Sequence, residues 1–175
     1  MYKNLKKEEK ALIKLIPIMF VLGCLSHFLY EFTGNNKFVG FICPINESIW
    51  EHMKLALYPV FLCNSIYYLI KGRKNKIDPN KWFTANMISV IVSMISIPFC
   101  YYLYTGALGI NNSIVNIFIL LIAIILGQIL ALHIYRRGRG NNAIFSISIV
   151  ILIMILFALL TYNPLNYPIF QDIRN

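Results

Sequence analysis

The sequence predicts an all-α fold, a polytopic membrane helical bundle with five transmembrane helices. Two observations lead to this prediction. Hydrophobic residues make up 58% of the 175 residues and charged residues only 13%, against roughly 25% charged in an ordinary soluble domain. The apolar residues also form long runs, such as residues 117–126 and 147–160. A soluble protein of this size has too few polar residues to surround such runs and shield them from water. The runs are therefore expected to be in contact with lipid.

Five segments are long enough to cross a bilayer, which takes about 20 mostly apolar residues. In chain order they are residues 11–32, 47–70, 82–105, 113–135 and 143–162. Short segments rich in Gly and Asn or in basic residues separate them, at residues 34–36, 71–73, 109–112 and 137–142. Neighbouring helices are therefore expected to be antiparallel and to form one transmembrane domain over residues 1–175.

Proline placement refines this picture. Pro59 and Pro98 lie inside the second and third spans, where each is expected to kink its helix. Pro164 and Pro168 follow the fifth span and are expected to keep an external tail, residues 163–175, extended and non-helical.

The charge balance is strongly basic, with sixteen Lys and Arg, seven Asp and Glu, and a formal net charge of +9. In a soluble protein this excess would suggest a nucleic-acid partner. Here the basic residues lie in the short segments between apolar runs, which indicates membrane topology instead. No nucleic-acid partner is therefore expected, and the lipid bilayer is the expected surrounding.

The positions of Lys and Arg predict the orientation. Thirteen of them lie in the N-terminal segment and in the second and fourth connections: Lys3, Lys6, Lys7, Lys10, Lys14, Lys71, Arg73, Lys74, Lys76, Lys81, Arg136, Arg137 and Arg139. Only Lys37 and Arg174 lie on the opposite side, with Lys54 just inside the second span. Because cytoplasmic segments carry the excess of Lys and Arg, we expect a multi-pass protein of the cell membrane with its N-terminus inside and its C-terminus outside.

The stretch CPINESIWEHMK, residues 43–54, concentrates ionisable groups in an otherwise apolar chain. At about 100° per residue, His27 and Glu31 share one face of the first helix. On the second helix Glu47, Glu51 and Lys54 form one stripe and Ser48 and His52 the adjacent one. Because the connection between the two helices is short, these polar faces are expected to meet near the outer edge of the bilayer.

One interpretation of this convergence is a metal site with His27, Glu31 and His52 as ligands. Nitrogen and oxygen ligands together suit a divalent ion such as zinc, manganese or non-haem iron. The ion would lower the pKa of a bound water, and Glu47 or Glu51 would act as the general base. This interpretation predicts an outward-facing, metal-dependent hydrolase of a lipid or another amphipathic substrate.

The alternative is a non-enzymatic membrane protein, a transporter or an interaction partner, in which the same groups form a structural polar network. Lys54 would pair with Glu51 or Glu47, His27 would bond Glu31, and Asn46 would cap the second helix. An ion or proton pathway would need polar groups deeper in the membrane, and the candidates are sparse: Asn86, Asn116, Gln128 and His133. A haem held by His27 and His52 lacks any supporting pattern.

The tail YNPLNYPIFQD leaves the fifth span on the outer side and carries Asp172. Its apolar residues Tyr167, Ile169 and Phe170 allow it to fold back as a lid over the helix ends. A loose terminus is the other expectation, and the sequence leaves both open.

Three segments carry a resemblance: HFLYE at 27–31, PINESIWEHMK at 44–54 and YPIFQD at 167–172. They resemble a family of small uncharacterised multi-span bacterial membrane proteins with the motif Pro-x-Asn-Glu-Ser-x-Trp-Glu-His-x-Lys. The resemblance covers nearly the whole chain and implies the same multi-span architecture. It implies no activity. The chain departs from the expected pattern at 163–165, where Asn-Pro-Leu stands in place of a Pro-Pro pair.

Overall fold

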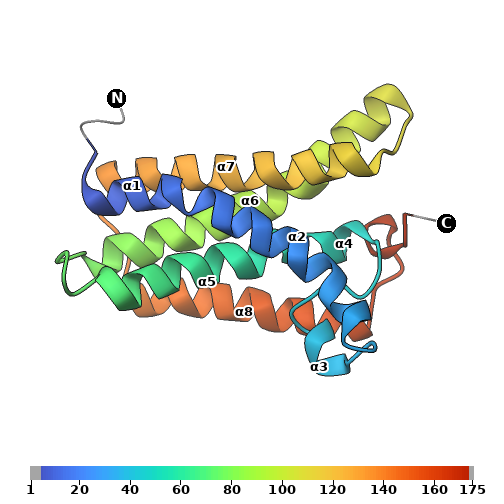
Figure 1. The fold of residues 1–175 in the computed structure, drawn as a ribbon, viewed down its shortest axis with the longest axis horizontal. Helices are drawn as coiled ribbons and strands as arrows, with labels where there is room; N and C mark the ends of the chain where they lie inside the picture. The colour runs from blue at the N-terminus through green and yellow to red at the C-terminus, as the bar shows by residue number, and fades with distance from the viewer. Residues whose placement is uncertain (1–4, 174–175) are drawn as a thin grey trace.

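The computed structural model describes residues 5–173, which form a helical bundle without a strand. Five helices are long and apolar enough to cross a membrane. The predicted all-α helical bundle is confirmed. The start of the first helix and the tail that follows the last lie at opposite ends of the bundle (Figure 1).

The first of the five combines α1 (Lys7–Lys14) and α2 (Ile16–Phe32), joined through Leu15, whose backbone stays helical. It begins earlier than the expected residue 11 because the Glu9 side chain caps its start. The backbone N–H of Lys6 donates to the Glu9 carboxylate at 2.9 Å. This bond satisfies a donor at the helix start that no backbone group can satisfy.

The second combines α4 (Ile49–His52) and α5 (Lys54–Lys71) and follows a one-turn helix, α3 (Lys37–Gly40). It begins two residues after the expected residue 47, because Ser48 is the N-cap. The Ser48 hydroxyl accepts a hydrogen bond from the backbone N–H of Glu51 at 3.3 Å.

The cap expected at Asn46 is thus wrong by two positions. Its side-chain oxygen instead accepts from the backbone N–H of Ser48 at 2.9 Å, in the turn that precedes the helix. The consequence matters for the site, since Glu47 lies before the helix and its side chain does not follow the helical stripe.

The third and fourth long helices, α6 (Pro79–Leu108) and α7 (Ser113–Arg137), form an antiparallel hairpin. Gly127 allows their close approach, because a Cβ there would collide with the Ser93 hydroxyl of α6. At 30 residues, α6 is about 45 Å long, more than the ~30 Å of a bilayer core. The tip of the hairpin therefore projects beyond the neighbouring helices (Figure 1).

The last long helix, α8 (Ala143–Tyr162), packs against α5 and α6. The tail after it is not fully extended as expected, because Pro168–Phe170 form a short 3₁₀ helix. This turn brings the Phe170 ring to 4.7 Å from the Trp50 ring, which also stacks on Phe157 at 4.1 Å. The tail thus folds back onto α4.

The orientation across the membrane stays a prediction. Lys3 and Arg174, which contribute to the charge count, lie outside the described residues. The remaining basic residues of the N-terminal segment, the α5–α6 connection and the end of α7 lie at the end of the bundle away from the tail (Figure 1).

Candidate metal centre

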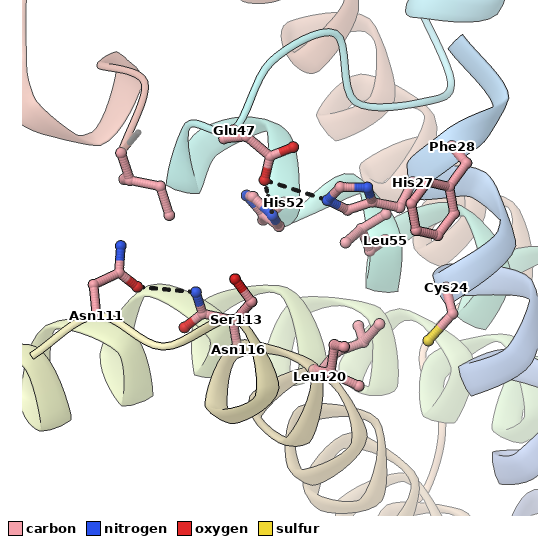
Figure 2. A pocket seen from close by; sticks show the side chains of 12 residues that line it. Cys24, His27, Phe28, Glu47, His52, Leu55, Asn111, Ser113, Asn116 and Leu120 are labelled. Atoms are coloured by element: carbon pink, nitrogen blue, oxygen red, sulfur yellow. Dashed lines mark hydrogen bonds and ion pairs between the residues drawn. The ribbon is translucent and has the colours of Figure 1, made fainter. Parts of the chain in front are cut away.

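Three side chains from two elements converge at the end of the bundle where the tail folds back. His27 comes from the penultimate turn of α2, Glu47 from the segment before α4, and His52 from the last residue of α4. Figure 2 shows Glu47 turned toward both histidines. Together they form the metal-ligand cluster, which lines a cavity of about 420 Å³ between α2, α4 and the start of α7.

The ligand atoms of this cluster are close together. Glu47 Oε2 lies 3.4 Å from His27 Nε2 and 3.3 Å from His52 Nε2. One ligand atom from each residue lies within 4.8 Å of the other two. Around a tetrahedral zinc ion, with bonds of about 2.1 Å, neighbouring ligand atoms are about 3.4 Å apart. Both histidine–carboxylate spacings match this value.

The backbone sets the orientation of the His52 ring. His52 Nδ1 lies 2.9 Å from the backbone carbonyl of Ser48, one turn earlier in α4. Because a carbonyl oxygen only accepts, Nδ1 is the protonated nitrogen and donates to it. The other nitrogen, Nε2, is thereby directed at Glu47. Metal-binding histidines are typically oriented in this way, by a bond from the ring nitrogen that does not bind the metal.

The contacts within the cluster need a proton or a metal ion between the carboxylate oxygen and each ring nitrogen. An ionised carboxylate and the bare nitrogen of a neutral imidazole both accept hydrogen bonds and repel each other at this separation. A proton on either ring relieves one of the two contacts. One divalent ion would relieve both, because it binds all three ligand atoms at once.

The composition of the cluster fits a catalytic zinc site better than a structural one. Structural zinc sites have four protein ligands, whereas catalytic sites have three and leave one position to water or substrate. Two histidines and one glutamate form such a three-ligand set. All three residues line the cavity, which has room for a water or substrate ligand.

The tail positions Glu47. The backbone N–H of Glu47 donates to the Asp172 carboxylate at 3.4 Å, and Ser48 and Asp172 form an isolated antiparallel bridge. The next tail residue, Ile173, lines the cavity. Asp172, singled out in the sequence, thus acts on the site through the backbone of the segment before α4.

A second cluster from the same motif has a different character. Glu51 and Lys54, which we term the ion-pair cluster, are buried and bonded at 2.8 Å. The Lys54 ammonium also donates to the carbonyls of Gly40 at 2.8 Å and Cys43 at 3.4 Å. All three of its hydrogens therefore have acceptors.

The Glu51 carboxylate is equally well satisfied. Its Oε2 accepts from Lys54 and from the backbone N–H of Ile45 at 3.0 Å, and its Oε1 accepts from the Thr161 hydroxyl of α8 at 2.9 Å. This cluster joins the segment before α4, α5 and α8. Burial also raises the pKa of the neighbouring Cys43 thiol, which the charge of Lys54 lowers by less.

The predicted site residues thus separate into groups. His27 and His52 lie together, as predicted, and Glu47, predicted as a general base, lies beside them. The role of the three side chains as metal ligands stays a prediction. Glu31 is exposed and is not part of the cluster. Glu51 points into the ion-pair cluster because it lies about 100° around the helix from His52.

Two of the polar residues considered for a membrane pathway have side-chain partners inside the bundle. The Asn86 carbonyl accepts from the Asn64 amide at 3.1 Å, and the Gln128 amide donates to Met19 Sδ at 2.9 Å. His133 is exposed near the other end of α7. Asn116 lies elsewhere, in the wall of the cavity.

That wall contains two residues that sequence reasoning missed, Asn111 and Ser113, beside Asn116, which was considered only for a membrane pathway. Asn111, Ser113 and Asn116 face the metal-ligand cluster across the cavity, from the α6–α7 connection and the first turn of α7 (Figure 2). Topology could have identified them, because this connection lies on the same predicted side of the membrane as the α2–α4 connection. The sequence suggested only a turn there.

Comparison with known proteins gives a family but no activity. The sequence profile of a family of unknown function (DUF6512) matches residues 1–175, so the chain belongs to this family. No curated protein and no solved structure matches the chain.

Proposed function

We propose that this member of the DUF6512 family is a membrane hydrolase with a divalent metal ion, zinc in the first instance, bound by His27, Glu47 and His52. Its substrate is a lipid or another amphipathic molecule. The observation that supports the proposal best is the convergence of three ligand atoms, within 4.8 Å of one another, beside a cavity of about 420 Å³. Three ligands and an accessible fourth position are typical of catalytic zinc.

The chemistry follows from this ligand set. A zinc ion held by these residues would lower the pKa of a coordinated water and polarise the ester oxygen. In the hydrolysis, the hydroxyl of the water would form the new bond to the acyl carbon or phosphorus, and the remaining proton would leave on the released alcohol. Glu51 has no role in this proposal, because Lys54, Thr161 and the Ile45 N–H occupy its oxygens.

The proposal places the protein in the cell membrane with the cavity on the outer side. The charge count supports this, because the Lys- and Arg-rich segments lie at the end of the bundle away from the cavity. A group near the end of a span is also cheaper to hold charged than one at mid-bilayer. A metal site at this depth is therefore accessible both to water and to lipid headgroups.

Metal content tests the proposal first. Purified protein is treated with a chelator, loaded with zinc chloride, freed of excess metal and analysed for its elements. We expect about one zinc per chain, lost in His27→Ala and in His52→Ala. His133→Ala, which removes the third histidine of the chain, is the matched control and should bind zinc normally. Zinc that survives both substitutions would refute the ligand set.

Hydrolysis is tested on the same preparations. Zinc-loaded protein is incubated with vesicles of mixed phospholipids, and lipid products are measured by mass spectrometry. We expect products with the wild type and none with His27→Ala. Stoichiometric zinc with no product would favour the alternative class, a non-enzymatic metal-binding membrane protein.

A further inference from the structure

The cavity has two unlike polar walls. One wall carries the metal-ligand cluster. The other, which we term the amide wall, consists of Asn111 and Asn116, with Ser113 beside Asn116 (Figure 2). No Lys or Arg of the described residues lines the cavity. A bound substrate group would therefore lie between a metal ion and uncharged hydrogen-bond donors.

A hydrogen-bonded network holds the amide wall in place. The Tyr104 hydroxyl donates to Asn116 Oδ1 at 2.7 Å and accepts from the backbone N–H of Asn112 at 3.2 Å. Asn116 Nδ2 in turn donates to Asn111 Oδ1 at 3.1 Å.

Both amide oxygens are thus occupied within the described part of the chain. Asn116 keeps one N–H, and the N–H groups of Asn111 take part in none of the hydrogen bonds among residues 5–173. The wall therefore presents donors to the cavity, and donors recognise an acceptor-rich group.

Charge narrows the identity of that group. A divalent ion bound by two neutral imidazoles and one carboxylate leaves the metal-ligand cluster with a net positive charge. An anionic group rich in oxygen acceptors complements both this charge and the amide donors. A phosphate diester has one negative charge and several acceptor oxygens, so it satisfies both walls.

The cavity also has an apolar side opening between α2 and α7. Phe28 of α2 is 65% exposed and Ile117 of α7 is 50% exposed, and both line the cavity. Cys24 and Leu120, one turn deeper, line it as well. Exposed apolar side chains on two helices of membrane-spanning length face lipid chains, so the cavity opens toward the bilayer as well as toward water.

We propose that the substrate is a membrane lipid with a phosphate in its headgroup, which enters sideways between α2 and α7. The phosphate binds between the metal-ligand cluster and the amide wall, and an acyl chain extends past Phe28 and Ile117 into the bilayer. This inference rests on the proposed metal site, whose substrate class it names.

Photolabelling tests the sideways entry. The full chain, loaded with zinc, is reconstituted in phosphatidylcholine nanodiscs with a trace of phosphatidylglycerol that carries a diazirine in its acyl chain. After irradiation, labelled residues are mapped by mass spectrometry. Labels should concentrate at 24–28 and 117–120.

Ile117→Trp should reduce that labelling about tenfold, because the larger ring fills the opening. Ile122→Trp is the matched control on the same helix, since Ile122 is 46% exposed and does not line the cavity. It should label as the wild type does. Even labelling over all five helices, or labelling that Ile117→Trp leaves unchanged, would overturn the inference.

Competition tests the headgroup. Unlabelled phosphatidylglycerol should displace the probe, whereas diacylglycerol, which lacks the phosphate, and inorganic phosphate, which lacks the chains, should not. Asn116→Leu should abolish this preference. Asn111→Ala, at an exposed position, should weaken it. Displacement by diacylglycerol as effective as that by phosphatidylglycerol would refute the phosphate assignment, and displacement by inorganic phosphate would refute the lipid.

Zinc content measured on the same nanodiscs separates the two proposals. Stoichiometric zinc with uniform labelling would refute only the lipid inference. Absence of zinc in the wild type would refute the proposed function instead.

Discussion

Residues 43–54 contribute to two clusters of titratable side chains. The clusters differ in how deeply their side chains are buried and in whether protein groups satisfy their polar atoms. In the ion-pair cluster, the side chains of Glu51 and Lys54 are 2% and 0% exposed. In the metal-ligand cluster, those of His27, Glu47 and His52 are 27%, 21% and 14% exposed. The first cluster is sealed within the bundle, and the second lies beside a cavity.

This difference distinguishes a structural role from a binding role. A buried ion pair is tolerated only when good geometry and further hydrogen bonds satisfy its remaining polar atoms. The ion-pair cluster meets that condition with protein groups alone. The metal-ligand cluster brings two ring nitrogens onto one carboxylate oxygen, an arrangement that a proton or a metal ion between the atoms stabilises. Substitutions in the two clusters should therefore affect different properties, stability in one and metal binding in the other.

The largest effect is expected from Lys54→Met. This change leaves the Glu51 carboxylate buried without its counter-ion, which costs about 3 to 5 kcal/mol of unfolding free energy. Denaturant unfolding of the purified protein in detergent measures it. Lys37→Met, at an exposed lysine, is the control and should be near neutral. The double variant Glu51→Gln/Lys54→Met should recover part of the lost unfolding free energy. If Lys54→Met alone were as stable as the wild type, the ion pair would be dispensable.

The next effect concerns zinc affinity and compares two glutamates. Glu47→Gln removes a ligand, so affinity should fall by more than the ~10–100-fold typical of losing an outer partner of a ligand. Glu31→Gln should leave zinc affinity unchanged, with stability within about 0.5 kcal/mol of the wild type, because its side chain is exposed. Isothermal titration with zinc chloride measures both affinities. If Glu31→Gln lowered zinc affinity and Glu47→Gln did not, the ligand set expected from the sequence, with Glu31 in place of Glu47, would be correct.

The smallest effect is expected from Thr161→Val, which removes one of the donors to Glu51 at nearly constant volume. An unsatisfied carboxylate oxygen in this buried place costs about 1 to 3 kcal/mol of unfolding free energy. Thr105→Val is the matched control. Among the described residues the Thr105 hydroxyl bonds only the Tyr101 carbonyl, one turn earlier, and the Thr161 hydroxyl likewise bonds the Phe157 carbonyl of its own helix. Zinc content should not change in either variant. Equal losses in the two would show that the bond to Glu51 adds nothing beyond local helix effects.

Sequence reasoning placed His27 and His52 near each other correctly in space, because both lie at helix ends joined by a short connection. It put Glu47 on a helical stripe with Glu51, although the helix starts only at Ile49. The helix start depends on the Ser48 cap, and the tail bonds Glu47 through Asp172. The second of these partners is 125 residues away in the chain, so no local pattern could indicate it.

The number of helices and the bundle architecture could be predicted from the order of residues, because apolar runs and turn residues act locally and depend on no distant partner. The division of one motif into a sealed ion pair and an accessible metal-ligand cluster could not. Adjacent residues such as Glu51 and His52 point about 100° apart. Thr161, from α8, bonds Glu51, and Asn116, from α7, lines the same cavity as His52. Only the packing of the whole bundle brings these residues together.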